Sequence, residues 1–302
     1  MTSTGNRDLR GSMTALVTPF RNGEVDWPAV NTLVDRQVEG GTDWLVPCGT
    51  TGESPTLTEE ESAKMLEVVL ARADGRCRVM AGTGSNNTAE AVRKTRRARE
   101  AGAHAAMLVA PYYNRPTPEG LYRHFAAVAE AVDIPIVLYN VPVRTGVTID
   151  NDVIARLRDG FSHIVAVKDA TGDLDGVTDL LNRCDIAVLC GDDALAWPMM
   201  AVGAVGVVSV ISNVCPALVK SLVLAAAAGR GAEALRLHRK LFDLAASLGR
   251  FGPNPLPIKT ALAVQGMIAD EFRLPLCPLG ADARAGIENV LRRHEIIKPE
   301  VS

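Results

Sequence analysis

The chain lacks the compositional features that mark several classes of protein. Its 302 residues carry 32 basic and 35 acidic side chains, so no excess of charge favours binding to nucleic acid or to an anionic membrane. No apolar run is long enough to span a bilayer, and the first eleven residues have no apolar core of the kind found in signal peptides. We therefore expect a cytoplasmic protein that acts on a small molecule, with no nucleic-acid or membrane partner.

Patterns of metal, disulfide and nucleotide sites are also missing. The six cysteines form no CxxC pair, and a 302-residue chain with 47% hydrophobic residues does not need disulfides, so we expect reduced thiols. The five histidines show no paired spacing, which predicts no metal site. No P-loop, Gly-x-Ser-x-Gly elbow or HExxH motif occurs. The chemistry must therefore come from other side chains.

Short apolar segments alternate with segments of helical spacing along most of the chain, which predicts parallel βαβ units. The predicted strands are 13–17, 44–46, 79–81, 105–109, 136–139, 164–168, 186–189 and 205–210. Eight such units close a (β/α)8 TIM barrel of the α/β class. An open doubly wound sheet is the rival, but Gly82-Thr83-Gly84 is followed by Asn87 where its phosphate turn needs a third glycine. We assign 1–230 to a catalytic barrel and 231–302 to a small C-terminal helical appendage.

One predicted strand ends in a lysine. His163 to Val167 run into Lys168, and Asp169 to Gly172 then close the strand with turn-forming residues. A lysine held against an apolar wall loses solvation, which disfavours its charged form and leaves a free amine that attacks carbonyls. The alternative is that Lys168 extends its amine to solvent or pairs with an acid such as Asp169. The residues at the ends of the other strands provide the evidence that distinguishes these two interpretations.

Several other strands end in polar residues, and catalytic groups of a barrel lie at the carboxyl ends of its strands. The Gly49 to Glu53 turn contains Thr50 and Thr51, whose amides and hydroxyls suit a carboxylate, although it could be only a tight turn. The phenol of Tyr139 can pass a proton if Thr50 and Tyr113 are in reach, or the ring can simply pack. We therefore expect these side chains to surround Lys168.

Three further residues near the strand ends have two possible roles. Arg144 could form a surface salt bridge or bind a carboxylate with both arms of its guanidinium. Asp192 and Asp193 are better explained as the start of a helix than as acid–base catalysts.

The chain resembles the dihydrodipicolinate synthases of the class I pyruvate aldolase family, which also includes N-acetylneuraminate lyase. The resemblance spans the barrel in family order and is carried by GTTGES (49–54), PYYNRP (111–116), YNVPVRTG (139–146), VAVKDATG (165–172), CGDD (190–193) and GVVSV (206–210). It implies that Lys168 forms a Schiff base with pyruvate and that Tyr139, Thr50 and Tyr113 relay protons, with Tyr113 reaching the neighbouring subunit's site.

The same resemblance implies the residues that bind substrate. Thr51 would hold the pyruvate carboxylate, and the main chain of Val208 would lie near pyruvate. Gly191, within CGDD, is also assigned to the substrate-binding residues. Arg144 would hold the carboxylate of L-aspartate 4-semialdehyde. Sialic acid lyases generally have GSTGE where this chain has Gly49 to Glu53 and lack an arginine at position 144, so both features favour the synthase.

The implied reaction condenses pyruvate with L-aspartate 4-semialdehyde to 4-hydroxy-tetrahydrodipicolinate, on the route to diaminopimelate and lysine, with no cofactor beyond the imine on Lys168. A homotetramer built as a dimer of dimers is also implied. Two alternatives remain: a paralogous aldolase or dehydratase acting on a sugar-acid or hydroxyproline-derived 2-keto acid, and a non-catalytic barrel that senses a keto acid. Intact Lys168, Tyr139, Thr50 and Tyr113 argue against the sensor.

Overall fold

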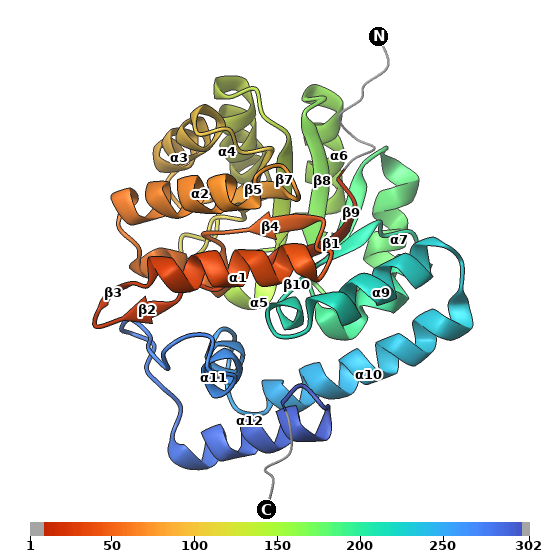
Figure 1. Ribbon diagram of the computed structural model, residues 1–302. Helices are drawn as coiled ribbons and strands as arrows, with labels where there is room; N and C mark the ends of the chain where they lie inside the picture. Colours follow the sequence, from red (N-terminus) through yellow and green to blue (C-terminus); the bar gives the residue numbers. More distant parts are fainter. Residues whose placement is uncertain (1–8, 298–302) are drawn as a thin grey trace, which may run out of the picture.

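The structure is a computed structural model and describes residues 9–297. Its centre is a closed barrel of eight parallel strands, in the order β1-β10-β9-β8-β7-β6-β5-β4 (Figure 1). The strands are β1 (Gly11–Ala15), β4 (Trp44–Val46), β5 (Arg78–Gly82), β6 (Ala105–Val109), β7 (Ile136–Asn140), β8 (Ile164–Asp169), β9 (Ala187–Cys190) and β10 (Gly206–Ser209). This confirms the predicted (β/α)8 barrel.

Helices surround the barrel and follow its strands in turn (Figure 1). The longer ones around the barrel are α1 (Trp27–Glu39), α2 (Glu59–Ala73), α3 (Thr88–Glu100), α4 (Pro118–Ala131), α6 (Asn151–Gly160), α7 (Leu174–Arg183), α8 (Ala196–Ala201) and α9 (Pro216–Ala227). Short helical turns lie at the strand ends: η1 (Thr50–Gly52), η2 (Ser54–Thr56), α5 (Pro142–Thr145), η3 (Asp193–Leu195) and η4 (Ile211–Asn213).

The strands divide their buried side chains between two apolar clusters. On β7, Ile136 and Leu138 join the larger cluster, which also contains the buried faces of the surrounding helices. Val137 and Tyr139 join a smaller cluster with Met13 of β1, whose members come from strands on all sides of the barrel. Because successive strand residues point to opposite faces, the smaller cluster fills the barrel interior. Tyr139 therefore points inward.

Helix starts follow the local signals in the sequence. Asp26 caps α1 by accepting a hydrogen bond from the Ala29 amide. Thr58 and Glu61 form the reciprocal capping box predicted for α2. The sequence analysis missed the two-stranded hairpin of β2 (Phe20–Arg21) and β3 (Glu24–Val25), as well as α5. These elements have two to four residues each, which is too short for a periodic pattern.

Three helices follow the barrel: α10 (Gly231–Gly249), α11 (Leu256–Val264) and α12 (Ala281–Arg293). In Figure 1, α11 and α12 lie at the end of the barrel that carries α5 and the β2–β3 hairpin. Since α5 follows β7, this is the end at which the strands finish. The helical appendage therefore adjoins the expected catalytic end, while the boundary at residue 230 stays a prediction.

Within residues 9–297, no helix combines the length and apolar character needed to cross a membrane. All six cysteines are free thiols.

Candidate active site

Lys168 is buried at the carboxyl end of β8, with only 5% of its surface exposed. Register pairs it directly with Tyr139 on β7, and its Nζ lies 3.9 Å from the centre of the Tyr139 ring. No carboxylate among residues 9–297 forms an ion pair with this amine. Asp169 Oδ1 instead accepts hydrogen bonds from the amide and hydroxyl of Thr171, at 3.0 and 2.8 Å. Pairing of Lys168 with Asp169 is thereby excluded.

A cavity of about 590 Å³ opens beside this pair. Its lining includes Thr50 after β4, Tyr139 at the end of β7 and Arg144 of α5. It continues outward between α2 and α3, where Glu59 and Arg97 line it. The lining therefore brings together three of the predicted residues. Lys168 is not part of the lining, but its amine lies against the ring of Tyr139, which is.

The Gly49 to Glu53 segment forms the short turn η1, directly after β4. Thr51 is buried, and its Oγ1 accepts a hydrogen bond of 2.9 Å from the side-chain amide of Asn254. A second hydroxyl supports the turn, because Thr18 Oγ1 donates to the Gly52 carbonyl at 2.7 Å. Hydrogen bonds from Asn254 and from Thr18 therefore hold the predicted carboxylate-binding turn in place.

Arg144 lies exposed on α5 at the edge of the cavity. Its Nη2 donates to the main-chain carbonyl of Asn254 at 2.9 Å. Asn254 thus contacts both Arg144 and Thr51, the two residues assigned to substrate carboxylates. The remaining guanidinium nitrogens of Arg144 form no ion pair within the described chain, which leaves them available to an anion.

The structure places Tyr113 apart from the other predicted residues. Its side chain is 92% exposed, at a backbone φ of 71°. The hydroxyls of Thr50, Tyr113 and Tyr139 form no hydrogen bonds with one another within residues 9–297. Thr50 and Tyr139 share the cavity lining, whereas Tyr113 is not part of it.

Gly191 and Val208 lie on the neighbouring part of the barrel. Val208 on β10 belongs to the interior cluster that contains Tyr139. Gly191 follows β9, and a Cβ at this position would lie only 2.9 Å from the Asp169 carbonyl. Glycine is therefore required for β9 to end this close to β8.

The two aspartates after Gly191 have structural roles. Asp192 caps η3 by accepting from the Ala194 amide at 2.9 Å. Asp193 Oδ2 accepts from the amides of Val210 and Ile211, at 2.9 and 3.0 Å. Burial raises the pKa of Asp193, against the hydrogen bonds that lower it. The contact of Asp192 agrees with its interpretation as a helix start. Asp193 is the first residue of η3, but its carboxylate ties β9 to the loop after β10, which the sequence analysis did not predict.

Comparison with known proteins identifies the family. The model of the Dihydrodipicolinate synthetase family matches residues 8–294. The chain belongs to this family. A protein of Pelobacter propionicus named 4-hydroxy-tetrahydrodipicolinate synthase is 49% identical over 291 residues, covering 96% of this chain and 100% of that protein.

Solved structures of the family have the same fold. The dihydrodipicolinate synthase of Aquifex aeolicus superposes with a TM-score of 0.93 at 46% identity, covering 95% of this chain and 99% of that one. A monomeric dihydrodipicolinate synthase variant also gives 0.93, at 37% identity, with 96% and 98% covered. The resemblance and the barrel inferred from the sequence are confirmed.

Beyond the motifs of the family, the structure reveals site neighbours that the sequence analysis missed. They come from the segment after α10 and contact the Gly49 to Glu53 turn: Asn254, Lys259 and Arg273. Asn254 lies in the short segment between α10 and α11. The available signal was Lys259, the lone charged residue of helix α11.

Proposed function

We propose that this chain is a 4-hydroxy-tetrahydrodipicolinate synthase that condenses pyruvate with L-aspartate 4-semialdehyde through a Schiff base on Lys168. The observation that carries the proposal is the Lys168 amine, which is buried beside the Tyr139 ring and has no carboxylate partner within residues 9–297. An amine that no carboxylate holds is free to attack a carbonyl carbon and form an imine.

The first step joins the Lys168 amine to the keto carbon of pyruvate and releases water. The resulting imine draws electrons from the adjacent methyl group, which loses a proton and becomes an enamine. We assign the proton transfers to Tyr139, whose ring contacts Lys168 and lines the cavity. Thr50, in the same cavity, is the assigned partner of Tyr139 in the relay.

The enamine carbon then attacks the aldehyde carbon of the second substrate, forming a carbon–carbon bond. The amine of that substrate attacks the imine carbon, closes the ring and displaces Lys168, which regains its free amine. No electrons are gained or lost overall, so the cycle needs no redox cofactor.

The two carboxylates are assigned to Thr51 and Arg144. The Thr51 hydroxyl and the amides of its turn suit the pyruvate carboxylate, with Gly191 and Val208 on the neighbouring strands. Arg144, at the cavity edge, is positioned to hold the carboxylate of the semialdehyde. Because Arg144 is exposed at the edge of the cavity, it is accessible to the second substrate after pyruvate is bound.

We propose a homo-oligomer, a tetramer made as a dimer of dimers, in which Tyr113 completes the relay in a partner's site. A tyrosine that is 92% exposed at the catalytic end supports a role outside its own chain. The monomeric variant among the solved relatives makes the test informative, because a fully active monomer of this chain would contradict the role of Tyr113. The cytoplasmic location stays a prediction.

Turnover with purified substrates tests the reaction. We expect loss of pyruvate and L-aspartate 4-semialdehyde together, and no release of pyruvate from a sugar acid such as N-acetylneuraminate. The names of the relatives favour this reaction over that of a sugar-acid or hydroxyproline-derived substrate. Pyruvate release from such a substrate, without turnover of the semialdehyde, would contradict the proposal.

A further inference from the structure

A second buried lysine lies under the turn that holds Thr50 and Thr51. The side chains of Lys259 on α11 and Glu53 are fully buried, and Lys259 Nζ donates to Glu53 Oε1 in an ion pair. Lys259 Nζ also lies 4.4 Å from the Phe20 ring centre and 4.5 Å from that of Phe272. The pair is therefore enclosed by aromatic rings and shielded from solvent.

Glu53 has a backbone conformation that needs external support. Its φ of 53° lies in the left-handed region, which residues other than glycine rarely adopt. Glu53 immediately follows the η1 turn of Thr50 to Gly52, and it also begins the next turn. Fixing its side chain therefore fixes the end of the turn that contains the assigned carboxylate-binding hydroxyl of Thr51.

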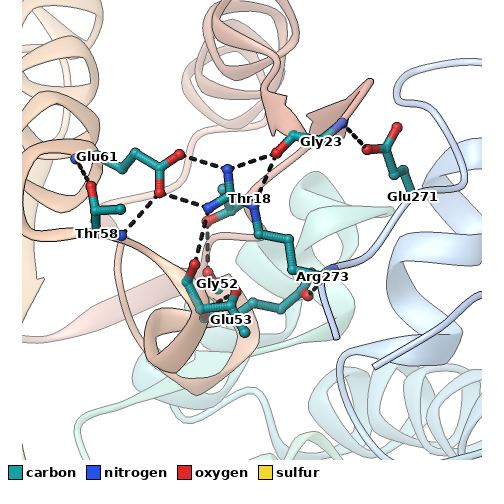
Figure 2. A network of polar contacts seen from close by, with 9 residues as sticks. Thr18, Gly23, Gly52, Glu53, Thr58, Glu61, Glu271 and Arg273 are labelled. Atoms are coloured by element: carbon teal, nitrogen blue, oxygen red, sulfur yellow. Dashed lines mark hydrogen bonds and ion pairs between the residues drawn. The ribbon is translucent and has the colours of Figure 1, made fainter. Parts of the chain in front are cut away.

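Arg273 provides a second connection from the same C-terminal segment. Its amide donates to Glu53 Oε2 at 3.3 Å, and its guanidinium donates to both oxygens of Glu61 at 2.6 Å. It also donates to the Gly23 carbonyl at 2.8 Å, so it joins the β2–β3 hairpin, the turn and α2 (Figure 2). The hydrogen bond of Arg273 with Glu61 lowers the pKa of that carboxyl, which stays ionised.

We propose that Glu53 and Lys259 are positioning residues that set the affinity for pyruvate by holding the Thr50 to Gly52 turn. The inference rests on the proposed function, because it assumes that Thr51 binds the pyruvate carboxylate. A buried ion pair contributes little net stability compared with an apolar pair of the same shape, but it fixes geometry. The C-terminal helical segment thus acts on substrate binding without contacting the substrate.

The test replaces Glu53 and Lys259 by uncharged side chains of similar size and shape. In the double variant Glu53→Gln/Lys259→Met, no unpaired charge is left buried, and the pyruvate concentration for half-maximal borohydride trapping should rise at least about tenfold. The KM for pyruvate should rise with it, while the KM for L-aspartate 4-semialdehyde stays within about twofold. A folded double variant that traps pyruvate at the wild-type concentration would overturn the inference.

The control is Asp43→Asn/Lys220→Met, which removes a partly exposed ion pair of the same residue classes. Lys220 Nζ donates to both oxygens of Asp43 at 2.6 and 2.7 Å, and Asp43 directly precedes β4, at the opposite end of the barrel. Loss of this pair should leave pyruvate trapping unchanged. A tenfold change in the control as well would show that any lost ion pair loosens the barrel, and would overturn the inference.

Two further outcomes are informative. If the double variant does not fold, the single Glu53→Gln variant is tested in its place. Its pyruvate concentration for half-maximal trapping should rise at least about threefold, and an unchanged concentration would contradict the inference. If the wild-type protein forms no adduct at any pyruvate concentration, the proposed function fails, and this inference fails with it. An adduct on the wild-type protein with an unaffected double variant contradicts the inference alone.

Discussion

Among residues 9–297, Lys168 and Lys259 are the buried lysines, and their surroundings differ. Lys168, at the end of β8, contacts the Tyr139 ring and has no carboxylate partner within residues 9–297. Lys259, on α11, contacts two aromatic rings and forms an ion pair with Glu53. Burial lowers the pKa of Lys259, against the opposing effect of Glu53. The difference indicates that Lys168 is free to react and that Lys259 holds Glu53 in place.

The largest expected effect is on the unpaired lysine. Lys168→Met should lower turnover by about a thousandfold or more, because no other described group can form the imine in its place. The variant should fold normally, since methionine fills the same space without a polar group to bury. Steady-state turnover together with thermal unfolding checks both expectations. Retention of more than a tenth of the activity would remove the distinction between the two lysines.

Lys259→Met tests the paired lysine. It leaves the Glu53 carboxylate buried without a cation, so the free energy of unfolding should fall by about 3 to 4 kcal/mol. Urea unfolding measures this loss, and Lys168→Met serves as the control with little change. Equal stability of Lys259→Met and Lys168→Met would contradict the role of Lys259 as the ion-pair partner that holds Glu53.

Tyr139→Phe sharpens the account of Lys168. The ring against the amine is kept, but the phenol is lost, so turnover should fall by about a hundredfold while the protein stays folded. The dependence of kcat on pH, measured beside the wild type, distinguishes a lost proton transfer from a packing effect. If the variant turns over at the wild-type rate, Tyr139 is only a packing residue.

A third buried base extends the comparison to stability. His124 has no acid partner within the described chain, and burial lowers its pKa to about 4. Between pH 6.5 and 4 the unfolded chain binds more protons at this residue than the folded chain, so stability is lost as the pH falls through this window. His124→Gln should lose less stability than the wild type between pH 7 and 4.5, by roughly 2 kcal/mol. Urea unfolding at both pH values measures it, and parallel losses would disprove the assignment.

The smallest expected effect concerns the exposed cation. Arg144→Ala should lower kcat/KM for L-aspartate 4-semialdehyde by about tenfold, while trapping of the pyruvate imine stays intact. Arg115→Ala is the matched control, because Arg115 is also exposed nearby and donates to the Gly146 carbonyl at 3.0 Å. Equal loss of imine formation and turnover in Arg144→Ala would remove the basis for its substrate assignment.

The barrel could be predicted because its signals are local. Each strand is a short apolar run between turn residues, and helix caps such as Asp26 and Thr58 lie within three residues of the amides they bind. The lysine at the end of β8 could be found in the same way. Its neighbour Tyr139 follows from strand order, since adjacent parallel strands end side by side.

The support for the site could not be predicted from local signals. Asn254 and Thr51 are 203 residues apart in the chain, and Lys259 and Glu53 are 206 apart. Neither pair belongs to one helix or strand, so no spacing in the sequence relates them. Their contact depends on how the C-terminal helices pack on the finished barrel. Similarly, the exposure of Tyr113 could be measured only in the folded chain.

Mapping of the reduced pyruvate adduct tests the central claim most directly. The protein is treated with pyruvate and borohydride and digested, and the modified peptide is identified by mass spectrometry. The account predicts one added pyruvate-derived group, on Lys168, in the wild-type protein and none in Lys168→Met. An adduct on Lys259 or on another lysine, or an unmodified chain, would contradict it.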